Sequence, residues 1–204
     1  MSRKAITSTK GSVPSQGKVL RIGVIGTGAF AEQCHLPGLQ SHPQAKVVAI
    51  AGRRPERLQS LAAQFNIPDV YTDYHELCAR TDLDAITIVT SNSEHAAQAT
   101  AGFASGKHVF CEKPLCDTWE EAVQLRELLA SHPPDRVLQV GHSERFHGAW
   151  ERWGEFSDFH SGPGQIRMDR VAPFKGRATD VDVVSDLMIH DLDIVLGLVK
   201  SEVA

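Results

Sequence analysis

The chain has 204 residues, of which 42% are hydrophobic and 23% charged, and its formal net charge is -4. These values are typical of a globular protein with one domain or one and a half, and they exclude a disordered chain. The net negative charge disfavours a nucleic-acid partner, and the lack of a run of about 18 apolar residues disfavours a membrane span. Four cysteines in a chain of this length indicate reduced thiols and a cytoplasmic protein.

The N-terminal segment, residues 1–17, is polar, basic and rich in Ser, Thr and Gly, and it predicts a disordered tail. A secretory signal peptide is not expected, because the segment lacks an apolar core of about 7–15 residues. A nearly continuous apolar run at 19–25 then predicts a strand buried on both faces. A glycine-rich turn follows, and we expect a helix from there to about Gln40.

Apolar runs and helix signals alternate along the following hundred or so residues. The runs predict strands at 46–51, 70–71, 85–90, 108–111 and 137–140. The helix signals predict a helix that begins at Pro55, a helix over 93–105 that Gly106 ends, and a helix capped by Thr118, where Glu121 completes a capping box. This alternation predicts an α/β fold with a doubly wound parallel sheet.

The alternation stops near Gly141, and we therefore predict three parts: a tail at 1–17, a doubly wound unit at 18–142 and a second unit at 143–204. In the second unit, the pattern predicts a strand at 165–171 and one longer helix from about Val183 to Val199.

A glycine-rich motif follows the first predicted strand: Gly26-Thr-Gly28-Ala-Phe-Ala31 fits G-x-G-x-x-[GA]. Glycines at these positions permit a tight turn and a close approach of the backbone to a pyrophosphate, which the helix N-terminus then stabilises. The position between a buried strand and a helix favours a dinucleotide site over a purely structural turn. The candidate cofactor-binding residues of this motif are Gly26, Thr27, Gly28, Ala29 and Phe30.

The end of the second predicted strand bears on the choice of nucleotide. An acidic residue about 20 positions after the motif would bind the ribose 2′-hydroxyl of NAD. The sequence there reads Ala51-Gly-Arg53-Arg54 and contains no carboxylate. Because arginine presents a planar fork of donors to oxyanions, Arg53 and Arg54 favour NADP over NAD. The alternative is that both are solvated residues at the start of a helix.

Other classes of site are disfavoured by their spacing. The segment 102–107 has one residue too few between its glycines for a P-loop, and Arg145 replaces the second glycine of a nucleophile elbow at 141–145. The sequence has no Cys-x-x-Cys or His-Glu-x-x-His pattern, and we expect no metal. A methyltransferase is disfavoured because Arg53 stands where that class usually has an acid.

A further set of motifs resembles a known family. Glu112-Lys113-Pro114 directly follows a predicted strand, and it occurs together with the Gly26 turn, Gly141-His142 and the segment 186–190, Asp-Leu-Met-Ile-His. This combination resembles the Gfo/Idh/MocA family of NAD(P)-dependent oxidoreductases over about residues 19–199. The family's Thr-Pro-Asn appears here as Thr-Ser-Asn at 90–92, which departs from the pattern.

The resemblance implies a fold and an activity. It implies an N-terminal Rossmann domain followed by an α+β substrate domain. It also implies hydride transfer between NAD(P) and a hydroxyl or keto carbon of a sugar, cyclitol or nucleotide-sugar, a small-molecule substrate. The segment 170–191 is similar to the subgroup that includes UDP-N-acetylglucosamine 3-dehydrogenases. The alternative is a non-catalytic NAD(P)-binding module or remnant.

The resemblance also implies roles for individual residues. Lys113 would hydrogen-bond the reacting hydroxyl, and its charge would stabilise a developing alkoxide. Asp186 would orient His190, four residues later on the same helical face, as a general acid–base. Whether Lys113 or His190 takes the proton stays open. Pro114 would fix the backbone beside Lys113, a cis bond being one way to do so. The implied cofactor contacts are Thr90, Asn92, His95, Glu112 and Lys113, with Glu112 at the nicotinamide ribose.

Members of this family are considerably longer, and their second domain is a large antiparallel sheet that often builds the oligomer interface. We therefore expect a chain that is truncated in its C-terminal domain and a homo-oligomer. The side chains that would then face water or need a partner are Leu187, Ile194, Val195 and Leu198. Asp191 and Asp193 are expected to be structural or solvated. His142 and Arg145 either contact substrate or serve packing.

Overall fold

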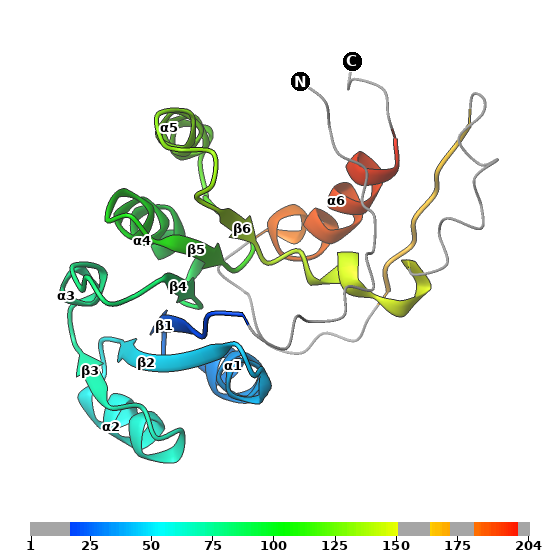
Figure 1. The fold of residues 1–204 in the computed structure, drawn as a ribbon. Coiled ribbons are helices and arrows are strands. Elements are labelled where there is room, and N and C mark those ends of the chain that lie inside the picture. Colours follow the sequence, from blue (N-terminus) through cyan, green and yellow to red (C-terminus); the bar gives the residue numbers. More distant parts are fainter. Residues whose placement is uncertain (1–16, 151–163, 172–181, 200–204) are drawn as a thin grey trace. The chain divides into compact units, whose positions relative to one another are not determined.

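A computed structural model describes residues 17–150, 164–171 and 182–199 of the chain. The chain divides into two compact units between Gly141 and His142, and each is described by itself. Figure 1 shows the elements in chain order. The tail predicted at 1–17 lies outside the described residues apart from Gly17.

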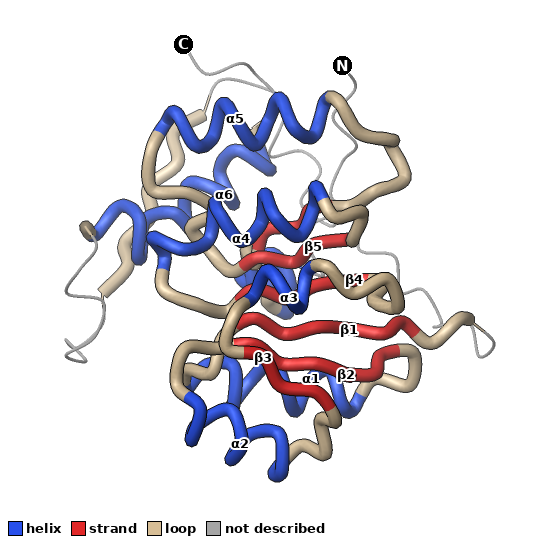
Figure 2. Tube along the Cα trace, turned by 90° about the vertical axis from the view of Figure 1, so that its left-hand side faces the viewer, coloured by secondary structure: helices blue, strands red, loops and turns tan. Residues whose placement is uncertain are grey.

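The first unit is built on a six-stranded sheet in the order β3-β2-β1-β4-β5-β6, in which every neighbouring pair is parallel. Figure 2 shows these strands side by side. The strand order reverses direction between β1 and β4, as in Rossmann folds, and the predicted α/β class is confirmed. The strands are β1 (Leu20–Ile25), β2 (Ala45–Ala51), β3 (Asp69–Tyr71), β4 (Ala85–Ile88), β5 (His108–Cys111) and β6 (Leu138–Val140).

Helices cover both faces of the sheet (Figure 1). Because successive side chains of a strand point to opposite faces, Val24 packs with Leu36 and Leu61 on one face, whereas Ile25 packs with Leu77 and Phe103 on the other. The first face is covered by η1 (Ala31–His35), α1 (Leu36–Ser41) and α2 (Pro55–Gln64). The second is covered by α3 (Tyr74–Cys78), α4 (Asn92–Ala104) and α5 (Trp119–Ala130).

Local sequence signals account for several helix ends. Thr118 Oγ1 accepts from the Glu121 amide at 3.2 Å, and the Glu121 carboxylate accepts from the Thr118 amide at 3.2 Å, so the predicted capping box at α5 is confirmed. Gly106 follows α4 with a φ of +89°. The short helix α3 was not predicted; its signal is Asp73, whose side chain accepts from the His75 amide at 2.8 Å.

The second unit contains a 3-10 turn, η2 (Ser143–Phe146), and a continuous helix made of η4 (Val184–Met188) and α6 (Ile189–Leu198). The helix predicted at 183–199 is therefore confirmed. Along it Ile194 is buried, Val195 and Leu198 are half-buried, and the exposed apolar side chains are Val184, Leu187, Met188, Leu192 and Leu196. No helix among the described ranges is long and apolar enough to cross a membrane.

The strand predicted at 165–171 is wrong. Residues 164–171 are exposed and form no ladder with any strand in the described part of the chain. A strand needs a neighbour that satisfies its backbone groups, and an alternating pattern alone does not supply one. The segment is instead tied by its side chains: Arg170 Nη2 donates to Asp191 Oδ1 at 2.7 Å.

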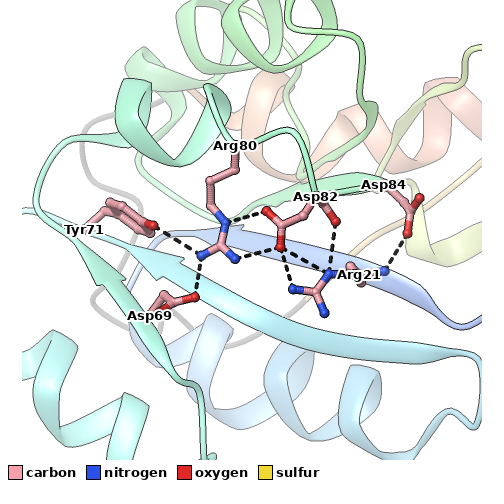
Figure 3. Close-up of polar contacts among 6 residues, drawn as sticks. All are labelled: Arg21, Asp69, Tyr71, Arg80, Asp82 and Asp84. Atoms are coloured by element: carbon pink, nitrogen blue, oxygen red, sulfur yellow. Dashed lines mark hydrogen bonds and ion pairs between the residues drawn. The ribbon is translucent and has the colours of Figure 1, made fainter.

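An ion-pair cluster joins the amino ends of β1 and β3 to the turn before β4 (Figure 3). Arg80 donates to both carboxylate oxygens of Asp82 at 2.9 and 2.8 Å. Asp82 also accepts from Arg21, and Arg80 reaches Asp69. Next to it, Asp84 accepts from the Arg21 amide at 2.8 Å. The Arg80 guanidinium holds the pKa of Asp82 well below its usual range, since it stabilises the ionised form.

We expect the variant Asp82→Asn to unfold at a lower temperature than the unaltered chain at pH 7. A carboxyl with a lowered folded-state pKa stabilises the fold above its unfolded pKa of about 4, and this contribution is lost as the pH falls through the folded-state value. The difference between the two midpoints should therefore shrink steadily as the pH falls below about 4, and it should be clearly smaller at about pH 2 than at about pH 7. Thermal unfolding followed by circular dichroism measures it. Asp135→Asn, at an exposed aspartate, is the control, and a gap that persists unchanged at pH 2 would contradict the explanation.

Candidate functional site

The predicted nucleotide motif and the Glu112-Lys113-Pro114 segment lie at the same edge of the sheet. The first follows the carboxyl end of β1, and the second follows the carboxyl end of β5. Thr90 and Asn92 follow the carboxyl end of β4, which lies between them. Open α/β sheets bind ligands at this edge, where the strand order reverses. The fold therefore brings together these predicted site residues from three separate segments.

The glycine-rich turn has the geometry that its sequence predicts. Gly26 has a φ of +125°, and a Cβ atom there would collide with the backbone carbonyl of Val89. Its amide donates to the Ala51 carbonyl at 2.9 Å, which anchors the turn to β2. Around a Cβ built on Gly28, in contrast, no atom lies within 4 Å. The first glycine thus makes the turn possible, and the second leaves the backbone open to a ligand.

Thr27 is buried, and it is contacted by Gly52, which follows β2, and by Arg57 of α2. Arg57, on the first turn of α2, donates from Nε to the Thr27 carbonyl at 3.3 Å and pairs with Glu32 of η1. A Cβ on Gly52 would lie only 2.7 Å from Thr27 Cγ2, so only glycine fits there without a shift. Sequence reasoning missed Arg57, although an arginine within a turn of the Arg53-Arg54 pair is the signal that could have found it. These contacts fix the turn against the end of β2.

Arg53 and Arg54 lie directly after β2, and both are exposed. Arg54 has an extended backbone and precedes the first residue of α2, which is Pro55. Neither arginine is buried in a packing role, whereas Arg57 is engaged by Glu32 and Thr27. The two arginines therefore follow the strand end at which Rossmann folds contact the nucleotide ribose. Ala29 and Phe30, in the turn itself, are also exposed.

His35 joins the two motif segments. Its Nε2 lies 2.9 Å from Glu112 Oε1, and both side chains are largely buried, with 15% and 16% of their surface exposed. The imidazole ring packs against Phe30 at 5.1 Å and against Phe110 at 5.5 Å between ring centroids. Sequence reasoning missed His35, and its only local signal is a polar residue within the helix that opens from the glycine turn. The contact fixes the start of that helix to the end of β5.

The loop that carries Lys113 is held by His95. The Lys113–Pro114 peptide bond is cis, in agreement with the expectation for Pro114. His95 is buried, with Nδ1 at 2.6 Å from the Pro114 carbonyl and Nε2 at 3.3 Å from the Thr90 carbonyl. Both neighbours are carbonyl oxygens, which only accept hydrogen bonds, and the shorter of the two contacts is at Nδ1. The structure thus gives His95 a role in joining two loops, and its direct contact with a cofactor stays a prediction.

Cys111 directly precedes Glu112 and was expected to be a core thiol. It is fully buried within the larger hydrophobic cluster of the sheet, and this burial raises the pKa of its thiol. A thiol that resists ionisation is a poor nucleophile, so Cys111 serves packing. The described residues contain no group of three or more His, Cys, Asp or Glu side chains that could hold a metal ion.

In the second unit, the predicted pair Asp186 and His190 lies on one continuous helix, four residues apart at the junction of η4 and α6. Both side chains are half-buried. The spacing keeps them on one side of the helix, as their predicted roles require. The helix is anchored by acidic residues that follow His190: Arg145 Nε donates to the buried Asp193 at 2.6 Å, and Arg170 holds Asp191. Arg170 also lowers the pKa of Asp191. These two aspartates are therefore structural, as expected.

A family model described as "Oxidoreductase family, NAD-binding Rossmann fold", GFO_IDH_MocA, matches residues 20–142. Among curated proteins, a 4-carboxy-2-hydroxymuconate-6-semialdehyde dehydrogenase from Sphingobium is 38% identical over 62% of this chain and 39% of its own length. A UDP-N-acetylglucosamine 3-dehydrogenase from Acidithiobacillus ferrooxidans is 34% identical over 90% of this chain and 55% of its own length. The chain thus spans roughly half the length, or less, of these relatives.

Solved structures give the same result for the fold. An apo scyllo-inositol dehydrogenase from Lactobacillus casei superposes with a TM-score of 0.76 at 23% identity, over 91% of this chain and 56% of the other. A 3-ketoreductase from Actinomadura kijaniata, in complex with NADP, superposes with a TM-score of 0.60 at 29% identity, over 69% of this chain and 44% of the other.

Proposed function

Because the chain belongs to the Gfo/Idh/MocA family of oxidoreductases, we propose that it transfers a hydride between a nicotinamide cofactor and a hydroxyl or keto carbon of a small-molecule substrate. The observation that carries this proposal is the 2.9 Å contact between His35 and Glu112. It holds the segment that ends in Lys113 beside the glycine turn that would bind the dinucleotide. Lys113, which would contact the reacting hydroxyl, and the glycine turn, which would bind the cofactor, therefore lie at the same edge of the sheet.

The described residues fit a dinucleotide. The turn at Gly26 directs the chain into η1 and α1, and the open space at Gly28 lets a pyrophosphate approach the backbone. The nicotinamide, when bound, supplies the hydride chemistry. The protein supplies position and proton handling. We propose that Lys113 hydrogen-bonds the reacting hydroxyl, and that His190, oriented by Asp186, is the acid–base group. Thr90, Asn92 and Glu112 are the further cofactor contacts proposed.

For the cofactor we propose a preference for NADP. The support is the exposed pair Arg53 and Arg54 at the end of β2, together with a relative whose structure contains NADP. We expect the double variant Arg53→Ala/Arg54→Ala to bind NADPH about 100-fold more weakly or worse, because each of the two arginines would donate a hydrogen bond to a charged group, which contributes roughly 1.5–3 kcal/mol. Its affinity for NADH should change by less than about threefold, since NADH lacks the 2′-phosphate.

Fluorescence titration with NADPH and, in parallel, with NADH measures both affinities. The matched control is Arg126→Ala, which removes an exposed arginine from α5. If the unaltered chain binds NADH more tightly, the proposed preference is wrong. Equal losses for both cofactors in the double variant would mean that the arginines support the fold rather than read a phosphate.

For the substrate we propose a sugar, cyclitol or nucleotide-sugar, with UDP-N-acetylglucosamine as the first compound to screen. The support is the relative that matches 90% of this chain. The screen follows reduction of the cofactor at 340 nm. Turnover of the nucleotide-sugar alone would identify its class. Turnover of free cyclitols alone would move the assignment to inositol dehydrogenases, and cofactor binding without any turnover would favour a non-catalytic nucleotide-binding module.

We also propose a cytoplasmic location and a homo-oligomer. The support for the first is that all four cysteines are free, two of them buried, as in a reducing compartment. The support for the second is the row of exposed apolar side chains along η4 and α6. Light scattering on the purified chain measures the second directly, and a monomer at micromolar concentration would contradict it.

A further inference from the structure

The Glu112 carboxylate is held in place from several directions. His35 contacts Oε1 at 2.9 Å, and the Lys113 amide donates to Oε2 at 3.3 Å. On another side, a Cβ built on Gly141 would lie 3.0 Å from all three carboxyl atoms, so the carboxylate packs directly against the backbone after β6. A side chain that is only 16% exposed and has these neighbours is fixed rather than free to rotate into solvent.

His35 is itself held by packing. Its ring contacts Phe30 in the glycine turn edge-on and Phe110 in β5 at a tilt. These two rings are apolar, and the polar contact of Nε2 is with the carboxylate of Glu112. The imidazole therefore links the glycine turn to the carboxylate, and its removal would leave the Glu112 carboxylate in the site but no longer held from that side.

A fixed negative charge at this edge of the sheet has a specific electrostatic consequence. The nicotinamide ring is positively charged in the oxidised cofactor and neutral in the reduced one, whereas the rest of the two molecules is the same. A nearby carboxylate in a partly desolvated site attracts the oxidised ring and leaves the reduced ring almost unaffected. General damage to the fold would weaken both forms alike.

On the basis of the proposed function, we propose that the carboxylate of Glu112, positioned by His35, makes this chain bind the oxidised nicotinamide cofactor in preference to the reduced one. Glu112 is the residue that meets the cofactor. His35 is a positioning residue that acts through Glu112. This pair of residues sets the ratio of the affinities for the oxidised and the reduced cofactor. It therefore decides which form occupies the site when both are present at equal concentration.

The test is the ratio of the two dissociation constants, for NADP⁺ and NADPH, measured by isothermal titration calorimetry at pH 8. We expect Glu112→Gln, which keeps the shape and removes the charge, to shift this ratio about tenfold toward the reduced form, a change that corresponds to roughly 1.4 kcal/mol of charge interaction. His35→Ala should shift the ratio in the same direction. His35→Gln, which retains an N–H donor, should restore most of it.

Glu127→Gln, at an exposed glutamate of α5, is the matched control for removal of one carboxylate, and its ratio should stay within about twofold of the original. Circular dichroism verifies that each variant is folded. If His35→Ala does not fold, the near-isosteric Glu112→Gln still decides the question. An unchanged ratio, or equal losses for both cofactor forms, would overturn the inference alone. Failure of the unaltered chain to bind either form would overturn the proposed function and the inference together.

Discussion

Replacement of Lys113 by Met is expected to lower turnover about a thousandfold while dinucleotide affinity changes by less than about threefold. The half-buried Lys113 lies directly after Glu112, at the edge where the cofactor is proposed to bind. Methionine keeps most of the aliphatic stem but supplies neither a hydrogen-bond donor nor a positive charge to a developing alkoxide. The loss should therefore appear in kcat rather than in cofactor binding.

Two measurements separate the role of Lys113 from a structural one. Fluorescence titration gives the cofactor affinity, and the initial rate at saturating cofactor gives kcat for a substrate found in the screen. Lys46→Met is the matched control, because Lys46 is an exposed lysine at the start of β2. Retained turnover in the Lys113 variant would show that Lys113 does not stabilise the reacting hydroxyl, and a parallel loss of cofactor affinity would point to a damaged loop.

Two alanine substitutions in one turn should have opposite consequences. We expect Gly26→Ala to lower the free energy of unfolding by about 2–4 kcal/mol, because alanine at a positive φ is strained and its Cβ would collide with backbone. The colliding atom is the Val89 carbonyl, which cannot move without disturbing the end of β4. Gly28→Ala should cost about 1 kcal/mol or less, since its Cβ meets open space.

The affinity for the cofactor should be lowered even in the variant whose stability is nearly unchanged. Gly28→Ala is expected to remain folded and yet to bind NADPH about a hundredfold more weakly, because the new methyl group occupies the space through which a pyrophosphate would approach. Chemical denaturation and fluorescence titration on the same samples measure the two effects. Gly38→Ala, at a glycine of α1 whose Cβ also meets open space, is the control. Normal cofactor affinity in Gly28→Ala would contradict the assignment of the turn to phosphate binding.

The amino-acid sequence by itself determined the elements and their order. Apolar runs indicated the strands, most clearly the central strands β1, β2 and β4, because strands buried on both faces have no polar alternation. Glycine, proline and the Thr118–Glu121 pair marked helix ends, because these signals act within a few residues of one another. The short helix α3 was missed, and the strand predicted at 165–171 was wrong, since a strand depends on a neighbour that its own residues do not encode.

The candidate site was predictable in its motifs but not in its contacts. Gly26, Gly28 and the Glu112–Pro114 segment stand out because each is a local pattern. Only the tertiary structure decided that His35 holds Glu112 and that His95 holds the Pro114 carbonyl. These pairs are 77 and 19 residues apart, and they meet only because parallel strands bring their carboxyl ends to one edge. Such contacts depend on strand order and crossover packing, which no short stretch of sequence specifies.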